Sequence, residues 1–407
     1  MKKKNILLVG AGGVSHVAAH KLAQNNDLFG NIYLASRSIE SCKQILKSIE
    51  RKKSYKDSSK KIQIKQINAL NVLDMIKLIE DLGISITVNL ASAFCNMSIL
   101  EACIETCSAY IDTAIHEEPY KVCEDPPWYA NYEWKRKDRC KDKITAILGA
   151  GFDPGVVNAY VAYAKKHFFD TINTIDIMDV NAGSHGKYFA TNFDPEINFR
   201  EFVKVWAWID KKWVCKTVHS EKRVYDFPVI GKQTIYLSGH DEIHSLSKNI
   251  DANSIRFWMG FSDHYINCFS VLRNIGLLSE KPIKTKEGVE VVPLKVVKAC
   301  LPDPKTLAPN YVGNTCIGDM IVGEKDGCKK EVFIYNVSNH ETCYSEVESQ
   351  AISYTAGVPI IAAAILVASG DWDVKKMVNV EELDPDPYLD LLGNMGLPTK
   401  ILFAKNL

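Results

Sequence analysis

The sequence predicts an α/β protein with two domains, and three observations lead to this prediction. A buried strand at residues 5–9 runs directly into Gly10-Ala11-Gly12-Gly13 and then into an amphipathic helix, the order found in dinucleotide-binding folds. Apolar strand patterns then alternate with helix patterns, as a parallel sheet requires. Beyond Gly155 aromatic residues become dense, and polar turns separate the strand-like runs. We therefore expect a Rossmann-type, doubly wound parallel sheet followed by an α+β domain.

The expected elements divide the chain into three parts. The first part, residues 1–150, should be the dinucleotide-binding domain. The second, residues 151–348, should bind substrate and form a dimer. The third, residues 349–407, returns to helix and should pack back on the first domain. Strands are expected at residues 5–9, 31–35, 62–67, 84–89, 109–112 and 144–148 in the first domain, and at 172–180, 203–209 and 331–337 in the second.

The glycine-rich turn has a specific physical role in such a fold. Gly10 allows the tight turn, and Gly12 lets a pyrophosphate approach the backbone. Gly13 and Val14 open the helix, whose N-terminus attracts the anion. Ser15 replaces the third glycine of the usual pattern and is small enough for close packing. The alternative is a glycine cluster at a turn that binds no ligand.

Composition excludes several classes of protein. The chain has 407 residues, 46% apolar and 24% charged, with 49 basic and 49 acidic residues. This balance predicts neither a nucleic-acid-binding nor a membrane-binding surface. The twelve cysteines show no CxxC pair and no metal-ligand spacing, so we expect no metal and a cytoplasmic protein. The apolar stretch 356–369 contains Gly357 and Pro359 and is too short to span a bilayer, which favours a buried helix.

The end of the second expected strand indicates which nicotinamide cofactor is bound. NAD-selective sites place a carboxylate there to bind the ribose 2′-hydroxyl. This chain has Ser36 and Arg37 instead, which suit a 2′-phosphate. The sequence therefore predicts NADP(H), unless Arg37 is only a solvated loop residue.

Residues at the ends of later strands should complete the cofactor site, because ligands bind at the carboxyl ends of strands in such sheets. Each of them could instead be an ordinary turn or helix cap. The adenine should lie near Asn68 and Ala69, and the nicotinamide half near Ala91, Ser92, Asp112 and Thr113.

Several separated motifs resemble the saccharopine dehydrogenase-like family. They are Tyr110-Ile111-Asp112-Thr113-Ala114, Gly149-Ala150-Gly151-Phe152-Asp153-Pro154-Gly155 and Tyr354-Thr355-Ala356-Gly357-Val358-Pro359. Segments 179–186, 195–201, 239–242 and 315–319 are similar to the branch of that family that forms polyamine precursors. The chain departs from the family pattern at Ser15 and at Asn68.

The resemblance implies a reductive condensation. The amine of putrescine or 1,3-diaminopropane condenses with the aldehyde of L-aspartate β-semialdehyde, and NADPH reduces the imine to carboxyspermidine or carboxynorspermidine. The resemblance also implies a homodimer that pairs through the second domain.

These substrates require particular side chains. Their carboxylate needs an arginine, for which Arg200 is the candidate, unless it is a surface residue beside Glu201. The distal ammonium needs carboxylates, and Asp179, Glu201, Asp241 and Glu242 are equal candidates. The proton donor and acceptor could be His185, Lys187 or Asp153, although the first two could be plain loop residues and Asp153 a helix cap. The substrate-like segments also include Asn181 and Thr355. We expect Thr355 to open a buried helix that faces the cofactor or the substrate, or that simply packs tightly between the domains.

Two other functions are compatible with these motifs. The first is an NADP-dependent, L-glutamate-forming saccharopine dehydrogenase, which differs only in its substrate pocket. The second is a non-catalytic NADP-binding sensor. Homospermidine synthase is a third relative, but it uses NAD, which Ser36 and Arg37 disfavour.

Overall fold

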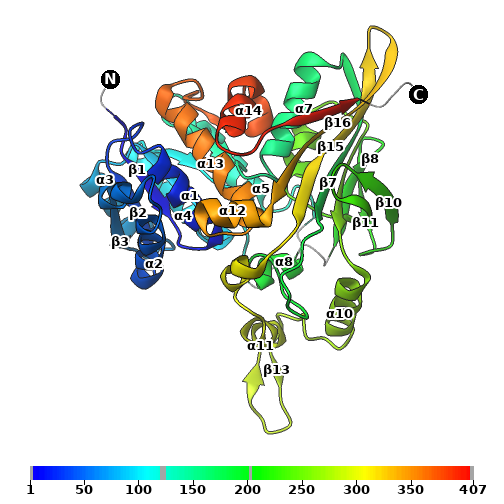
Figure 1. The fold of residues 1–407 in the computed structure, drawn as a ribbon, viewed down its shortest axis with the longest axis horizontal. Helices are drawn as coiled ribbons and strands as arrows, with labels where there is room; N and C mark the ends of the chain where they lie inside the picture. Colours follow the sequence, from blue (N-terminus) through cyan, green and yellow to red (C-terminus); the bar gives the residue numbers. More distant parts are fainter. Residues whose placement is uncertain (1–2, 120–124, 201–203, 404–407) are drawn as a thin grey trace.

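The computed structural model describes residues 3–119, 125–200 and 204–403. Two sheets form its framework (Figure 1), one with helices on both faces and one largely antiparallel. The predicted α/β architecture with two domains is confirmed. The domain boundaries at residues 150 and 348 stay predictions.

The first sheet is parallel throughout and has, in the described part of the chain, the order β17-β6-β5-β4-β1-β2-β3. Its strands are buried runs of apolar residues, as expected for a sheet covered on both faces. The six strands expected from the sequence are present, and β17 is an addition from the C-terminal segment. The strands are β1 (Ile6–Val9), β2 (Ile32–Ser36), β3 (Ile62–Gln66), β4 (Ile86–Asn89), β5 (Ala109–Ile111), β6 (Ala146–Leu148) and β17 (Met377–Asn379).

Helices connect these strands, and local capping explains where some of them begin. The hydroxyl of Ser38 accepts a hydrogen bond from the Ser41 amide at the start of α2, and Asn71 caps α3 in the same way. The basic stretch 51–61 forms turns and a short 3-10 helix, η1 (Lys56–Lys61). The helices are α1 (Gly13–Gln24), α2 (Ile39–Glu50), α3 (Val72–Leu82), α4 (Asn96–Thr106), α5 (Ala130–Trp134) and α6 (Lys137–Cys140).

The second sheet has the order β10-β11-β12-β7-β15-β16-β18 among the described residues, with β8 and β9 attached beside β12. Only the β12–β7 pair is parallel within it. Its strands are β7 (Thr171–Asn181), β8 (Val205–Ile209), β9 (Lys212–Lys216), β10 (Lys222–Phe227), β11 (Gly231–Ser238), β12 (Ser254–Gly260), β15 (Asn314–Lys325), β16 (Cys328–Asn339) and β18 (Lys400–Phe403).

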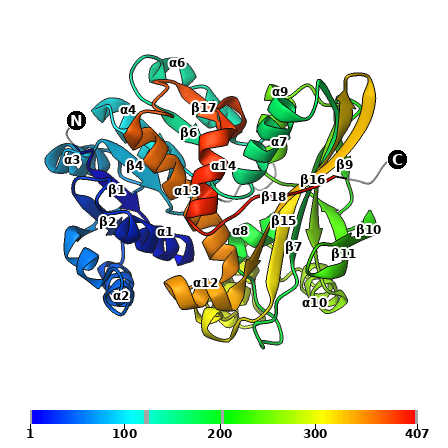
Figure 2. The same cartoon turned by 45° about the horizontal axis from the view of Figure 1, so that its top comes forward.

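The C-terminal segment connects the two sheets. Helix α13 (Ala351–Ser369) lies against α1, and α14 (Pro385–Asn394) lies against α13 and α7 (Val156–His167) (Figure 2). Strand β17 joins the first sheet, whereas β18 joins the second. The segment therefore does more than pack back on the first domain.

Helix α13 is the expected buried helix, but it begins earlier than expected. Its mean hydropathy of 2.0 would suit a membrane span by composition, yet 83% of that stretch is buried inside the protein. A Cβ at Gly357 would lie 2.7 Å from the Cβ of Val17 in α1, so glycine permits the close approach of the two helices. Because the helix begins at Ala351, Thr355 lies inside it and does not open it.

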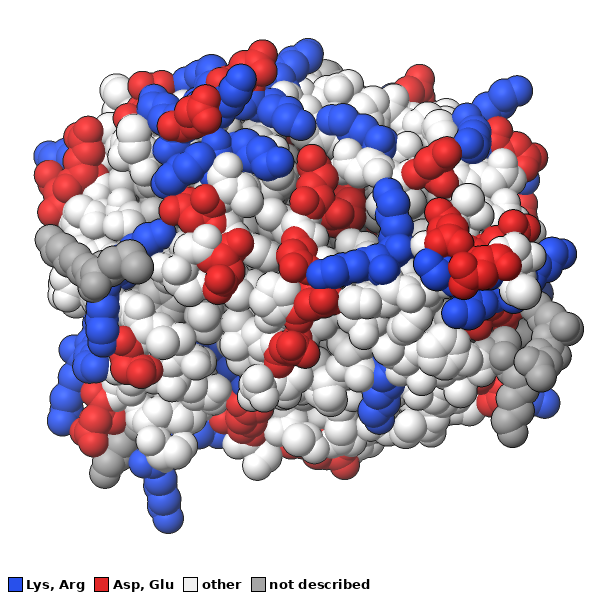
Figure 3. Space-filling model, turned by 90° about the horizontal axis from the view of Figure 1, so that it is seen from above, with Lys and Arg blue, Asp and Glu red and all other residues white. Residues whose placement is uncertain are grey.

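A smaller arm projects from the second domain (Figure 1). It carries the hairpin of β13 (Ile283–Lys284) and β14 (Glu290–Val291) next to α11 (Pro293–Cys300). Four further helices follow β7 in the chain. They are α8 (Pro195–Arg200), α9 (Glu242–Asn249), α10 (Asp263–Asn274) and α12 (His340–Val347). Lysines and arginines lie interspersed with acidic side chains on the face drawn in Figure 3.

Candidate active site

The glycine-rich loop between β1 and α1 has the geometry of an anion site. Gly10 has φ +117°, and a Cβ there would lie 2.2 Å from the carbonyl oxygen of Leu90, so only glycine fits. A Cβ added at Gly12 would have no described atom within 4 Å, so the space beside this residue is open. Ser15 is fully buried in the first turn of α1, and within the described part of the chain its hydroxyl has no hydrogen-bond partner. These features suit the pyrophosphate of a dinucleotide at the positive end of α1.

A cleft of about 680 Å³ opens at this loop. Helices α1 and α2 line it on the side of the first domain, and residues 301–309 line it on the side of the second. It shares Val14, Phe193 and Ser353 with a second cavity deeper between the domains. The two spaces therefore adjoin, as the phosphate and nicotinamide parts of one cofactor would require.

The residues expected at the adenosine end lie at the edge of the first sheet. Ser36 ends β2, and the carbonyl of the exposed Arg37 accepts a hydrogen bond from the Gln66 side chain at 3.0 Å. Arg37 and Asn68 line one shallow groove, together with Lys77 and with Asp74 and Asp81 of α3. Ala69 is buried nearby.

The second cavity, of about 250 Å³, lies between the domains at the carboxyl ends of β5 and β6. Thr113 and Asp153 line it from the first sheet, as expected for a ligand site in such a fold. The second domain and α13 close it. Side chains that could bind or react there are Glu117, Trp128, Asp153, Asp179, Arg200, His240, Asp241 and Thr355.

The lining of this cavity is rich in half-buried aspartates. The side chain of Asp153 hydrogen-bonds that of Asp179. Burial raises the pKa of Asp179 to about 6, although the electrostatic interaction with His240 opposes the shift. Burial also raises the pKa of Asp241, whose carboxylate accepts a hydrogen bond from the Ile115 amide at 2.8 Å. Acids of this kind are strongly stabilised by a bound cation.

His240 lies beside these acids and has a fixed orientation. Its Nδ1 lies 2.6 Å from a carboxylate oxygen of Glu242, which is fully buried. Its ring stacks on Phe257 at a centroid distance of 4.1 Å. A histidine that lines a cavity and is oriented by a buried carboxylate has the arrangement of a general acid–base group.

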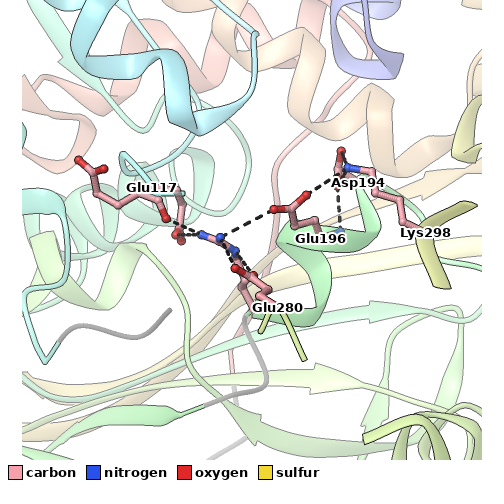
Figure 4. A network of polar contacts seen from close by, with 7 residues as sticks. Glu117, Asp194, Glu196, Glu280 and Lys298 are labelled. Carbon is pink, nitrogen blue, oxygen red and sulfur yellow. Dashed lines mark hydrogen bonds and ion pairs between the residues drawn. The ribbon is translucent and has the colours of Figure 1, made fainter. Parts of the chain in front are cut away.

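Arg200 lines the same cavity but is already bound by acids, of which Figure 4 labels Glu117, Glu196 and Glu280. It makes a two-point ion pair with Glu280, at 2.8 and 2.9 Å, and a further one with Glu117 at 2.8 Å. Glu196 lies 3.8 Å away. Burial raises the pKa of Glu117 to about 7, although Arg200 opposes the shift. Among the described lining residues, Arg200 is the only lysine or arginine.

The remaining predicted residues lie elsewhere. His185 packs against Tyr311, and Lys187 is exposed, and neither lines the cavity. Asn181 hydrogen-bonds the Tyr311 hydroxyl and also contacts His340.

The other residues expected at the cofactor lie at the ends of β4 and β5. Asp112 is buried, and its carboxylate accepts a hydrogen bond from the Gly149 amide at 2.7 Å, which connects β5 to the end of β6. Ala91 and Ser92 follow β4 beside the glycine loop, and Glu201 lies outside the described residues.

Sequence reasoning did not assign a role to His240. The signal was present, because the segment Gly239-His240-Asp241-Glu242 belongs to the family-like motifs. The roles of these residues depend on the turn after β11. This turn brings His240 to the cavity, whereas Glu242 is buried and contacts the His240 ring. Spacing alone does not show which of the two faces the ligand.

Two family models match the chain. The NADP binding domain of saccharopine dehydrogenase matches residues 6–148, and the saccharopine dehydrogenase C-terminal domain matches residues 151–397. The apo saccharopine dehydrogenase (L-Glu forming) from Saccharomyces cerevisiae shares the fold. Its TM-score is 0.67 at 13% identity, covering 99% of this chain and 100% of that one.

Curated relatives are considerably more similar in sequence. Carboxynorspermidine synthases from Vibrio alginolyticus and Vibrio cholerae are each 46% identical, over 96% and 97% of this chain and 95% of each relative. A carboxyaminopropylagmatine dehydrogenase from Synechocystis is 42% identical over 97% of this chain and 96% of that protein. Together with the fit of the glycine loop, these matches confirm the predicted cofactor, NADP(H). The chain is an NADP-dependent oxidoreductase and belongs to the saccharopine dehydrogenase family.

Proposed function

We propose that this protein catalyses the NADPH-dependent reductive condensation of L-aspartate β-semialdehyde with a diamine, putrescine or 1,3-diaminopropane. The products would be carboxyspermidine or carboxynorspermidine. The observation that carries the proposal is the cavity beside the glycine loop, which Arg200 lines together with the acids Asp153, Asp179 and Asp241. The names of the Vibrio relatives support the same reaction.

The half-buried acids suit the distal ammonium of a diamine. An ammonium bound beside Asp153 and Asp179 would favour the ionised form of Asp179, whose pKa is raised by burial. Trp128 also lines this space, and its indole N–H has no hydrogen-bond partner among the described residues. The acids therefore provide a binding site for the end of the substrate that does not react.

His240 is the proposed proton-transfer group. It accepts a proton as the neutral amine attacks the aldehyde carbon, and it returns a proton to the departing hydroxyl as the imine forms. Glu242 keeps the ring oriented during both transfers. The bound cofactor supplies the hydride that reduces the imine carbon. Asp153 is the second candidate for the same role, as the sequence suggested, because it too lines the cavity.

Arg200 is the proposed partner of the substrate carboxylate. To bind it, the guanidinium must exchange one of its acidic partners for the substrate. Glu117 is the candidate to leave, because burial favours its neutral form and it contributes one hydrogen bond where Glu280 contributes two.

A mixture assay tests the reaction. Oxidation of NADPH should require both the aldehyde and an amine, and should proceed with putrescine or 1,3-diaminopropane. Agmatine tests the substrate suggested by the name of the Synechocystis relative, and glutamate tests the saccharopine dehydrogenase alternative. Oxidation with glutamate and not with diamines would reject the proposal, and no oxidation with any amine would favour the sensor.

The cellular setting is also a proposal. We infer a cytoplasmic homodimer paired through the second domain, from the family resemblance and the absence of a predicted disulfide framework. Sedimentation of the purified protein measures its mass, and a monomer at micromolar concentration would contradict the homodimer.

A further inference from the structure

A loop of the second domain reaches the glycine-rich loop of the first. The Nζ atom of Lys305 donates a hydrogen bond to the carbonyl oxygen of Ala11 at 2.8 Å. Ala11 lies between Gly10 and Gly12. The ammonium of Lys305 therefore lies at the glycine-rich turn that is expected to bind the pyrophosphate of the cofactor. Lys305 also lines the same cleft as Gly12, Gly13 and Ser15.

The loop that carries Lys305 is held in place by its own contacts. The carboxylate of Asp303 accepts the Lys305 amide at 3.0 Å, and the Thr306 hydroxyl donates to the Asp303 carbonyl at 2.7 Å. Leu307 is 1% exposed and packs in a small cluster with Tyr311. The backbone under Lys305 is therefore ordered before any ligand binds, which reduces the entropy lost on binding.

The charge of Lys305 is not neutralised within the described part of the chain, where no acidic side chain forms an ion pair with it. Its field nevertheless acts on the groups around the cleft. Burial lowers the pKa of His16 in α1, and Lys305 contributes to that lowering. Lys298 lines the same cleft but differs, because both oxygens of Asp194 bind it at 2.8 and 2.9 Å.

We propose that Lys305 is a pyrophosphate-binding residue that the second domain supplies to the cofactor site. Its ammonium would pair with the diphosphate while the free amides at the start of α1 and the Ser15 hydroxyl bind from the first domain. The cofactor would then bridge the domains at its phosphates as well as at its nicotinamide. This role is separate from that of Arg37, which faces the 2′-phosphate end.

Calorimetric titration of the purified enzyme with NADPH, NADH and 2′-AMP tests this role. Lys305→Met should weaken NADPH and NADH by the same factor, about tenfold to a hundredfold, because both carry the pyrophosphate. Binding of 2′-AMP, which lacks it, should not change. Lys305→Arg should retain most of the affinity, and Lys298→Met, the matched control in the same cleft, should retain all of it.

Two results would overturn the assignment. If Lys305→Met binds both cofactors as the parent does, the lysine only ties two loops together. If it loses affinity for NADPH alone, Lys305 serves the 2′-phosphate and not the pyrophosphate. Thermal unfolding of each variant without cofactor shows whether the fold is intact, and Lys305→Gln provides a second neutral variant if the methionine variant is unstable.

Discussion

At the scale of single residues, the end of β2 decides between two cofactors that differ by one phosphate. Arg37 is exposed there and no carboxylate ends the strand. Arg37→Asp should raise the KM for NADPH about tenfold to a hundredfold, the size of a lost charge-assisted phosphate contact. The KM for NADH should change far less. Steady-state kinetics with the two cofactors measure this, and an equal change for both would show that Arg37 does not read the 2′-phosphate.

His240 provides a second test at the residue scale. Replacement by asparagine should lower kcat by about a hundredfold to ten-thousandfold, as expected for a lost general acid–base group. Glu242→Gln should lower it less, since the ring stays stacked on Phe257 but loses its orienting carboxylate. Lys187→Met is the control, because Lys187 is exposed and away from the cavity. If the Lys187 variant is the impaired one and the His240 variant is active, the assignment is wrong.

The sequence predicted residue identities better than residue roles. The glycine loop, Arg37, Thr113 and Asp153 could be located because each follows a strand whose pattern is clear. The sequence favours His185 and Lys187 because functional groups concentrate in polar loops, but neither residue lines the cavity. The role of His240 could not be predicted because it depends on the packing of β11 and β12 against β7, which lies much earlier in the sequence.

At the scale of elements, Arg200 connects α8 to two loops of different origin. Its donors bind Glu117 after β5 and Glu280 after α10, and its side chain is 4% exposed. Arg200→Met leaves both carboxylates without their cation, so it should destabilise the protein by roughly 3–5 kcal/mol, the cost typical of breaking a buried pair. Urea unfolding measures this cost. Lys298→Met, on the half-exposed Asp194 pair, should cost under about 1 kcal/mol, and a similar loss for both would contradict the account.

The limits of prediction at this scale follow from element length. The long apolar runs of the first sheet were predictable because both faces of a parallel sheet are buried. Strands β17 and β18 were not predictable, because three or four residues are too few to show an alternating hydrophobic pattern. Their partner strands are also distant in the sequence. The apolar pattern places the start of α13 too late because the first turn, from Ala351, includes the polar Ser353, which lines both the cleft and the cavity.

At the scale of the whole molecule, buried acids link stability to pH. Burial raises the pKa of Asp112 to about 7, so the folded protein keeps a proton that the unfolded chain loses near pH ~4. The protonated Asp112 carboxyl therefore contributes fully to the free energy of unfolding below pH ~4. This contribution declines as pH rises and is lost above about pH 7. Between about pH 4 and 7 the free energy of unfolding of the parent should fall as pH rises, and Asp112 should account for up to about 1.4 kcal/mol of that fall per pH unit. Asp112→Asn should remove this part of the slope. Urea unfolding at several pH values measures it, and parallel curves for parent and variant would contradict it.

The domains meet along the cleft and the cavity, and we propose that a diamine and an aldehyde are joined and reduced there. The most direct measurement supplies NADPH deuterated at its transferable position, with L-aspartate β-semialdehyde and putrescine, and analyses the products by mass spectrometry. The account predicts a single secondary amine containing both carbon chains, with one deuterium on the carbon that came from the aldehyde. Deuterium found only in the alcohol of the aldehyde, with no joined product, would contradict it.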